Sequence, residues 1–136
     1  MTGTANMIKA MVVSGLAALI AYAMNRLIVS VFGDGAVRLL VPIVEEGLKT
    51  GLALTFAVSL PIVHMSFGIY EAIYDVLANR GVGRSRRWLA ALLAFLGHSI
   101  FGWLTWFFLE LGLVSVFAIV LVGTVHACWN IVALAK

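Results

Sequence analysis

Five long stretches of apolar residues, separated by short polar or turn-forming segments, make up most of the chain. They cover residues 7–32, 39–58, 61–79, 88–109 and 113–135. A helix needs about 20 apolar residues to cross the hydrocarbon core of a bilayer, and each stretch comes close to or exceeds that length. None of them alternates apolar and polar residues as a half-buried strand does. The pattern predicts an all-α integral membrane protein, a single domain over residues 1–136 built as a bundle of five transmembrane helices.

The segments between the stretches contain residues that interrupt helices. Gly33 and Gly35 follow the first stretch, and Gly112 precedes the last one. Pro61 lies in the first turn of the third stretch, where a helix tolerates proline. The arginine-rich segment at residues 80–87 contains two further glycines and is expected to be a loop.

The first stretch has a second interpretation. Met11–Met24, together with Ala21-Tyr22-Ala23, has the features of a signal peptide and its cleavage site. Apolar residues continue to Phe32, however, so we interpret the stretch as a retained helix. We expect no site residue on it.

Composition supports a membrane protein and excludes several other classes. Hydrophobic residues make up 63% of the 136 residues and charged residues only 11%, whereas soluble domains carry roughly a quarter charged residues. This excludes a water-soluble globular domain, a nucleic-acid-binding domain, a disulfide-stapled secreted module and a disordered tail. The single cysteine, Cys128, cannot form a disulfide within the chain.

The positions of lysine and arginine predict the orientation of the helices. With five spans, seven of the nine basic residues fall on one side: Arg26, Arg38, Arg80, Arg84, Arg86, Arg87 and Lys136. Lys9 falls on the other side, and Lys49 lies inside a span. Because basic residues accumulate in cytoplasmic segments, we expect the N-terminus outside and the C-terminus in the cytoplasm. The net charge of +3 then reflects topology, and we expect no nucleic-acid partner.

Six ionisable residues lie well inside the predicted spans. They are Glu45, Glu46, Lys49, Glu71, His98 and His126. Each charged residue at the membrane centre costs roughly 2.5–3.5 kcal/mol, so an ionisable residue there indicates a function. At a rise of 1.5 Å per residue, each of the last four helices places one acid or imidazole roughly 10–15 Å from the same membrane face. His64 is roughly 22 Å from that face and is expected outside the shared site.

The spacing on the second stretch suggests how its polar residues are used. Glu45 and Lys49 are four residues apart, and Glu46 and Lys49 are three apart, so either carboxylate can pair with the lysine. The two glutamates point about 100° apart on a helix and are expected to have different roles. Gly47 and Gly51 form a pair of small residues that is expected to let another helix approach closely.

Four motifs follow one another on successive stretches: Glu45-Glu46-x-x-Lys49, Phe67-x-x-x-Glu71, His98 and His126-x-x-x-Asn130. Together they resemble the superfamily of CAAX-processing proteases and bacteriocin-processing membrane enzymes. The first two motifs are most similar to its PrsW-type branch, and the last is similar to the CAAX branch. The resemblance covers about Glu45–Asn130. The chain differs from the CAAX branch at Glu71, where that branch has histidine.

The resemblance implies a glutamate-dependent intramembrane endopeptidase. Glu45 would be the general base, with Glu46 or Lys49 setting its charge state. Glu71 would hold or share the attacking water. These roles fit hydrolysis by an activated water, since a carboxylate near a second carboxylate and a lysine is a common form of general base.

The remaining motif residues would complete the reaction. His98 would orient the water or protonate the leaving amine, whereas His126 and Asn130 would donate hydrogen bonds to the oxyanion. Phe67 and Lys49 would support the site. The resemblance implies membrane-anchored substrates, such as anti-sigma factors, prenylated tails or leader peptides, in a prokaryotic plasma membrane. The sequence also allows a homo-oligomer.

Several alternatives stay open. The glutamates and Lys49 can form a structural ion pair, and the histidines can be hydrogen-bonded between helices without catalysis. No cofactor is expected, but Glu71, His98 and His126 could together give zinc three protein ligands. The chain could also be an inactive scaffold like the APH-1 subunit of γ-secretase, or a proton-coupled carrier. A carrier is disfavoured because the five stretches show no internal repeat.

Overall fold

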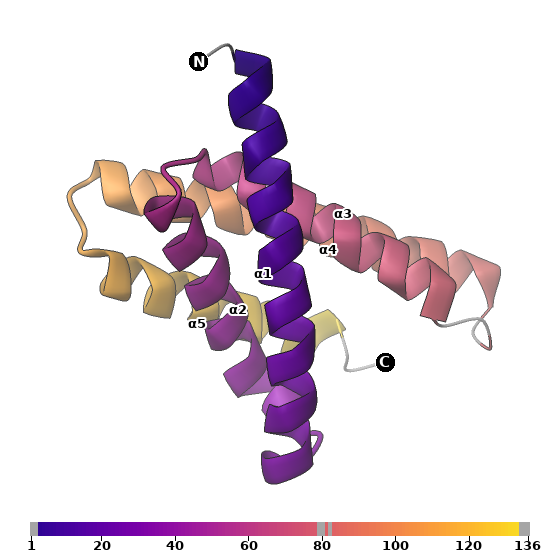
Figure 1. Ribbon diagram of the computed structural model, residues 1–136. Coiled ribbons are helices and arrows are strands. Elements are labelled where there is room, and N and C mark those ends of the chain that lie inside the picture. The colour runs from indigo at the N-terminus through magenta and orange to yellow at the C-terminus, as the bar shows by residue number, and fades with distance from the viewer. Residues whose placement is uncertain (1–2, 79–80, 82, 134–136) are drawn as a thin grey trace.

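The computed structural model describes residues 3–78, 81 and 83–133 and contains five helices (Figure 1). They are α1 (Gly3–Phe32), α2 (Ala36–Thr55), α3 (Leu60–Ala78), α4 (Arg84–Glu110) and α5 (Ser115–Ala133). The described residues contain no β-strand, so the predicted all-α class and the five helices are confirmed.

The largest difference from the predicted helix bounds lies in the arginine-rich segment. We predicted a loop over residues 80–87, but α4 already begins at Arg84. Arginine is a good helix former, so the helix can start directly after Gly83, whose ψ of 141° is extended. The Arg87 guanidinium donates a hydrogen bond to the Val76 carbonyl oxygen (3.3 Å) and ties this first turn to α3. The predicted topology residues Arg80 and Lys136 lie outside the described residues.

Two of the expected helix breakers act through their backbone conformation. Gly33 follows α1 with φ at 77°, and Gly112 follows α4 with φ at 83°. A side chain at such a left-handed position would be strained, which is why glycine commonly ends a helix.

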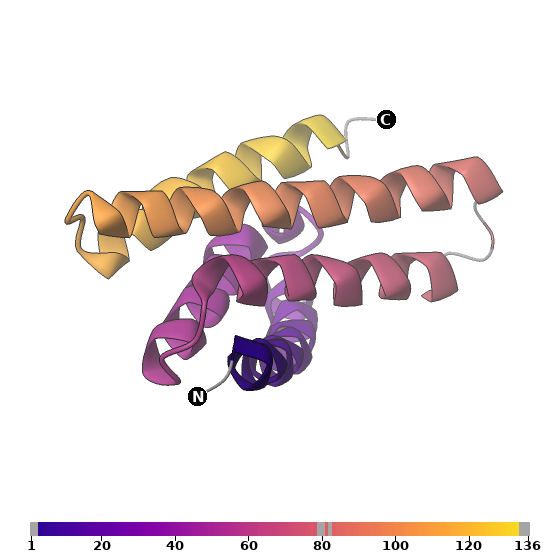
Figure 2. The same cartoon turned by 90° about the horizontal axis from the view of Figure 1, so that it is seen from above.

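The helices form two pairs, with α1 across them. α3 and α4 run antiparallel as a hairpin, α5 lies beside α4, and α2 packs against α5 (Figure 2). α1 crosses the α3–α4 hairpin and also contacts α2 (Figure 1). The centre of the molecule is therefore the region where α2, α3, α4 and α5 meet beneath α1.

Close approach between helices depends on glycines other than the predicted pair. A Cβ atom on Gly102 would lie 2.6 Å from the His64 Cβ atom, and one on Gly68 would lie 3.0 Å from the Phe95 Cα atom. Both glycines lie between α3 and α4. The prediction for Gly47 and Gly51 was wrong: a Cβ on the first would meet only an isoleucine side chain at 4.0 Å, and one on the second nothing within 4 Å.

Gly102→Ala is therefore expected to destabilise the protein by about 1–3 kcal/mol, because the added methyl group overpacks the α3–α4 contact. The matched control is Gly51→Ala, which adds the same methyl group where there is open space. This control is expected to leave stability unchanged or slightly increased, since alanine favours helix more than glycine. Thermal unfolding of both variants in detergent micelles tests the difference, and equal midpoints would contradict it.

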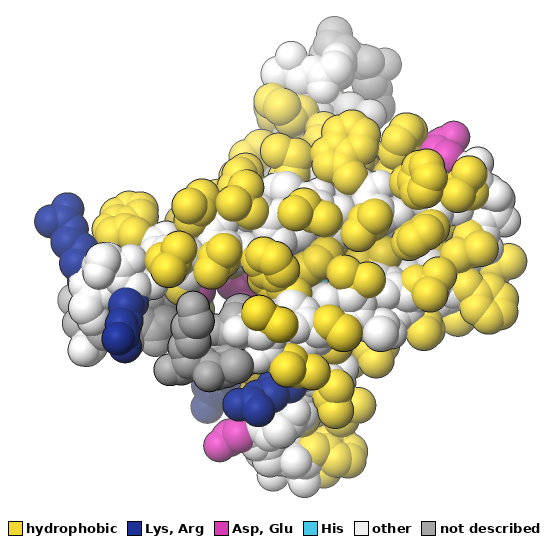
Figure 3. Space-filling view, turned by 180° about the vertical axis from the view of Figure 1, so that it is seen from behind, with side chains coloured by type: hydrophobic (Ala, Val, Ile, Leu, Met, Phe, Trp, Pro, Cys, Tyr) yellow, Lys and Arg dark blue, Asp and Glu magenta, His cyan; other side chains and the backbone are white. Residues whose placement is uncertain are grey.

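Three of the helices are long and apolar enough to cross a membrane: α1, α4 and residues Ser115–Val132 of α5. α2 and α3 carry most of the buried ionisable residues. Large apolar side chains are exposed on all five helices, and on the face in Figure 3 they cover most of the surface, with basic side chains near its edge. An exposed apolar surface of this extent is compatible with a membrane protein.

Candidate functional site

The ionisable residues of four helices meet in one cluster at the centre of the molecule. α2 contributes Glu45, Glu46 and Lys49, α3 contributes His64 and Glu71, α4 contributes His98, and α5 contributes His126. All of them are buried except Glu71, whose side chain is 39% exposed. Residues up to 80 positions apart in the sequence are thereby hydrogen-bonded.

Lys49 connects three helices. Its ammonium group donates to Glu46 Oε1 (2.5 Å) and to His98 Nδ1 (2.9 Å), and it lies 4.7 Å from the centre of the Phe67 ring. Because lysine only donates hydrogen bonds, Nδ1 of His98 must accept. The proton of the neutral ring is then on Nε2, which donates to Glu71 Oε2 (2.5 Å). A continuous chain of hydrogen bonds thus runs from Glu46 through Lys49 and His98 to Glu71.

Glu46 is the centre of a second set of contacts. Its Oε1 atom also lies 3.0 Å from His126 Nδ1, which therefore carries the proton in the neutral ring. The Nε2 atom of His126 is then left with a lone pair. Phe101 stacks on the His126 ring at 4.6 Å and holds its orientation. Sequence reasoning missed Phe101, although it lies one turn after His98 on the same helix face.

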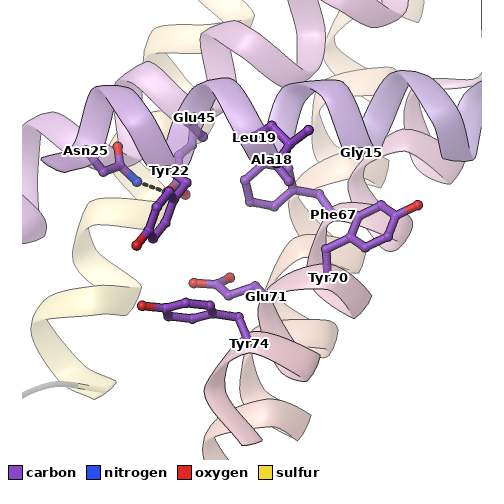
Figure 4. A pocket seen from close by; sticks show the side chains of 11 residues that line it. Gly15, Ala18, Leu19, Tyr22, Asn25, Glu45, Phe67, Tyr70, Glu71 and Tyr74 are labelled. Atoms are coloured by element: carbon purple, nitrogen blue, oxygen red, sulfur yellow. Dashed lines mark hydrogen bonds between the residues drawn. The ribbon is translucent and has the colours of Figure 1, made fainter. Parts of the chain in front are cut away.

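Glu45 has a different environment from Glu46, as expected for neighbouring helix positions. Its Oε1 atom accepts a hydrogen bond from the Asn25 side-chain amide (2.7 Å), as Figure 4 shows. Asn25 lies on α1, so the expectation that the first helix contributes no site residue was wrong. The sequence contained one signal for it: Asn25 is a polar amide, next to Arg26, near the end of a largely apolar stretch.

A pocket of about 650 Å³ opens beside this cluster, between α1, α2 and α3 (Figure 4). Glu45 and Glu71 are its acidic lining residues, and Phe67 forms part of its wall. The other lining residues are small, apolar, amide or aromatic: Gly15, Ala18, Leu19, Ala21, Tyr22, Asn25, Tyr70 and Tyr74. The pocket gives a molecule access to two of the predicted catalytic carboxylates.

His64 was expected near the opposite membrane face, but it lies in the cluster. It is fully buried, and its Nδ1 atom is 3.5 Å from Glu46 Oε2. Its ring nitrogens make no hydrogen bond within the described chain. The sequence held a signal here, because His64, Phe67 and Glu71 are spaced three and four residues apart and share one face of α3.

Asn130 is the predicted site residue that the structure uses differently. Its amide donates to the Val37 carbonyl oxygen (3.5 Å), which ties α5 to the beginning of α2. Among the described residues it makes no hydrogen bond to the cluster. An oxyanion role for Asn130 therefore has no geometric support here.

A metal site was considered for Glu71, His98 and His126. The atoms that come within 4.8 Å of one another instead belong to Glu45, His98 and His126. Both ring nitrogens of His98 already have partners, Lys49 on one side and Glu71 on the other. A zinc ion bound there would have to displace one of them, and next to Nδ1 it would face an ammonium group. The donor set does not fit a resident zinc ion.

No protein-family model, curated protein or solved structure matches this chain.

Proposed function

We propose that this protein is an intramembrane endopeptidase that hydrolyses a membrane-associated protein or peptide with a glutamate-activated water, near the cytoplasmic side of a prokaryotic plasma membrane. One observation carries the proposal: the carboxylates and imidazoles of four helices meet beside a pocket that two of the carboxylates line. The motif resemblance to CAAX-processing and PrsW-type proteases supports the same activity. Buried ionisable groups next to a pocket favour a site of chemistry over a purely structural cluster.

Glu45 is the general base in this proposal. It is buried at the pocket, and the amide of Asn25 holds one of its oxygen atoms. The carboxylate keeps further acceptor capacity for a water molecule, since each of its two oxygens has two lone pairs. Glu71, on the neighbouring wall of the pocket, holds the same water from the other helix. A base within hydrogen-bond reach of its water is the first requirement for this chemistry.

The histidine roles follow from their hydrogen bonds. His98 has both nitrogens engaged, so it acts as a positioning residue for Glu71 and does not protonate the leaving amine. Among the described residues, none forms a hydrogen bond with the Nε2 atom of His126, and its Nδ1–H donates to Glu46 Oε1. A carboxylate in that position fixes the tautomer and the orientation of the imidazole ring. In this proposal Glu45 takes the proton of the attacking water, and His126 receives it from Glu45 on its Nε2 atom and gives it to the leaving amine.

The experiment that tests this proposal is a cleavage assay with the purified protein in lipid nanodiscs. The substrates are synthetic peptides with one apolar membrane anchor and varied sequence near its cytoplasmic end, and mass spectrometry identifies the products. Specific cleavage, insensitive to serine-protease inhibitors, is expected. Intact peptides throughout the panel, with a folded protein, would contradict the proposal and favour the scaffold alternative.

A chelator is expected to leave the rate of cleavage unchanged, because both His98 nitrogens are occupied and the donor set does not fit zinc. The measurement compares initial rates before and after exhaustive dialysis against EDTA. A rate that falls and then returns on addition of zinc would overturn the metal-independent mechanism.

A further inference from the structure

The pocket has an apolar part and an acidic part. Gly15, Ala18 and Leu19 line it from α1, whereas the carboxyl groups of Glu45 and Glu71 enter it from α2 and α3 (Figure 4). Pockets of this volume bind small groups through apolar contacts and a few polar groups that fix the orientation. The neutral polar groups of the lining are an asparagine amide and three tyrosine hydroxyls, and its charged groups are the two glutamates, so the complementary charge is positive.

The charges of the cluster point the same way. Lys49 is the cation of the cluster, and its ammonium group is bound to Glu46. Within the described chain, no lysine or arginine pairs with Glu45 or Glu71, whose hydrogen-bond donors are an amide and an imidazole. Ionisable groups inside a membrane usually pair with one another. Two carboxylates that no lysine or arginine of the described chain neutralises therefore favour a positively charged ligand in the pocket.

Aromatic rings surround the acidic part. Tyr22, Tyr74 and Phe67 line the pocket near the two carboxylates (Figure 4), and the first two lie edge to face at 5.8 Å. The guanidinium of Arg26, an exposed side chain outside the pocket lining, lies 5.9 Å from the centre of the Tyr22 ring, so this ring contacts a cation. Aromatic faces attract ammonium groups most strongly where water is excluded.

We propose that the pocket binds a lysine side chain of the substrate, so that the enzyme selects apolar segments carrying a lysine close to the cleaved bond. This inference rests on the proposed peptidase function and names its substrate class. The aliphatic stem of lysine lies along the apolar wall, and its ammonium group donates to Oε1 of Glu71, while His98 binds Oε2. Glu45 then stays available to the attacking water. A lysine in a membrane segment costs roughly 2.5–3.5 kcal/mol, and pairing in the pocket offsets part of that cost.

The test measures binding separately from cleavage. Ala18→Cys, made together with Cys128→Ser, places one thiol in the pocket wall, and its reaction with a maleimide is followed in nanodiscs. Two apolar peptides that differ at one position, lysine or norleucine, are added in turn. Norleucine has an apolar linear side chain without the amine. The lysine peptide is expected to slow labelling at about tenfold lower concentration than the norleucine peptide. This is the difference in affinity that one hydrogen bond to a charged group contributes.

The controls separate this inference from the proposed function. Glu71→Gln is expected to abolish the preference for lysine, whereas Glu110→Gln, at the exposed end of α4, keeps it. Equal protection by the two peptides would overturn the inference even if the protein cleaves both. A lysine preference without any cleavage would support the binding site and contradict the peptidase. The comparison of the two peptides on one protein decides the question even where Glu71→Gln does not fold.

Discussion

Glu45→Gln is expected to lower the kcat of peptide cleavage by about 10²–10⁴-fold, the usual contribution of a general base. Glutamine has nearly the same shape, and its carbonyl oxygen can still accept the hydrogen bond from Asn25. It cannot accept the proton of a water molecule. The measurement is kcat and KM for one cleavable peptide in nanodiscs, with thermal unfolding as the test of the fold.

Glu110→Gln provides the matched control, because it makes the same chemical change at an exposed helix end far along α4. Its kcat is expected to equal that of the wild type. If Glu45→Gln cleaves as fast as the wild type, Glu45 is not the base. A loss of kcat accompanied by an equal loss of folded protein would mean that Glu45 is structural, so the two readouts are needed together.

Lys49→Met is expected to destabilise the folded protein by about 3–5 kcal/mol, the cost of leaving a buried carboxylate without its partner. Lys49 is fully buried, and it donates to both Glu46 and His98. Methionine fills a similar volume without the charge, so the loss comes from the unpaired Glu46. The free energy of unfolding is measured by denaturant titration in mixed micelles.

The double variant Lys49→Met with Glu46→Gln is the control. It removes both charges of the pair, and its stability is expected to be well above that of Lys49→Met alone, because replacing both partners costs less than removing one. The coupling between the two sites follows from a double-mutant cycle. Additive losses would show that Lys49 does not act through Glu46.

Much of the fold could be predicted because its causes are local. Glycines end α1 and α4, and each apolar stretch is long enough for a helix. The observed helix bounds differ from the predicted ones by a few residues, mostly at helix ends. The start of α4 was missed because helix formation by arginine competed with the loop tendency of Gly81 and Gly83. The glycines at close helix contacts could not be identified, since a glycine reveals nothing about its neighbour on another helix.

The candidate site was predictable only in part. Glu45, Glu71, His98 and His126 could be selected because charged and imidazole side chains are rare in apolar helices. His64 was missed because the estimate of depth assumed helices standing upright across the membrane, whereas contact with α4 at Gly102 brings it toward Glu46.

The sequence by itself determined that the chain is helical and strongly apolar, and which of its residues are costly to bury, because these follow from residue type and spacing along one helix. The tertiary structure alone decided that Lys49 pairs with Glu46, that Asn25 of α1 holds Glu45, and that two carboxylates line one pocket. Such contacts depend on how helices distant in sequence cross one another. That geometry is set by packing between their faces and is not encoded in the pattern of any single helix.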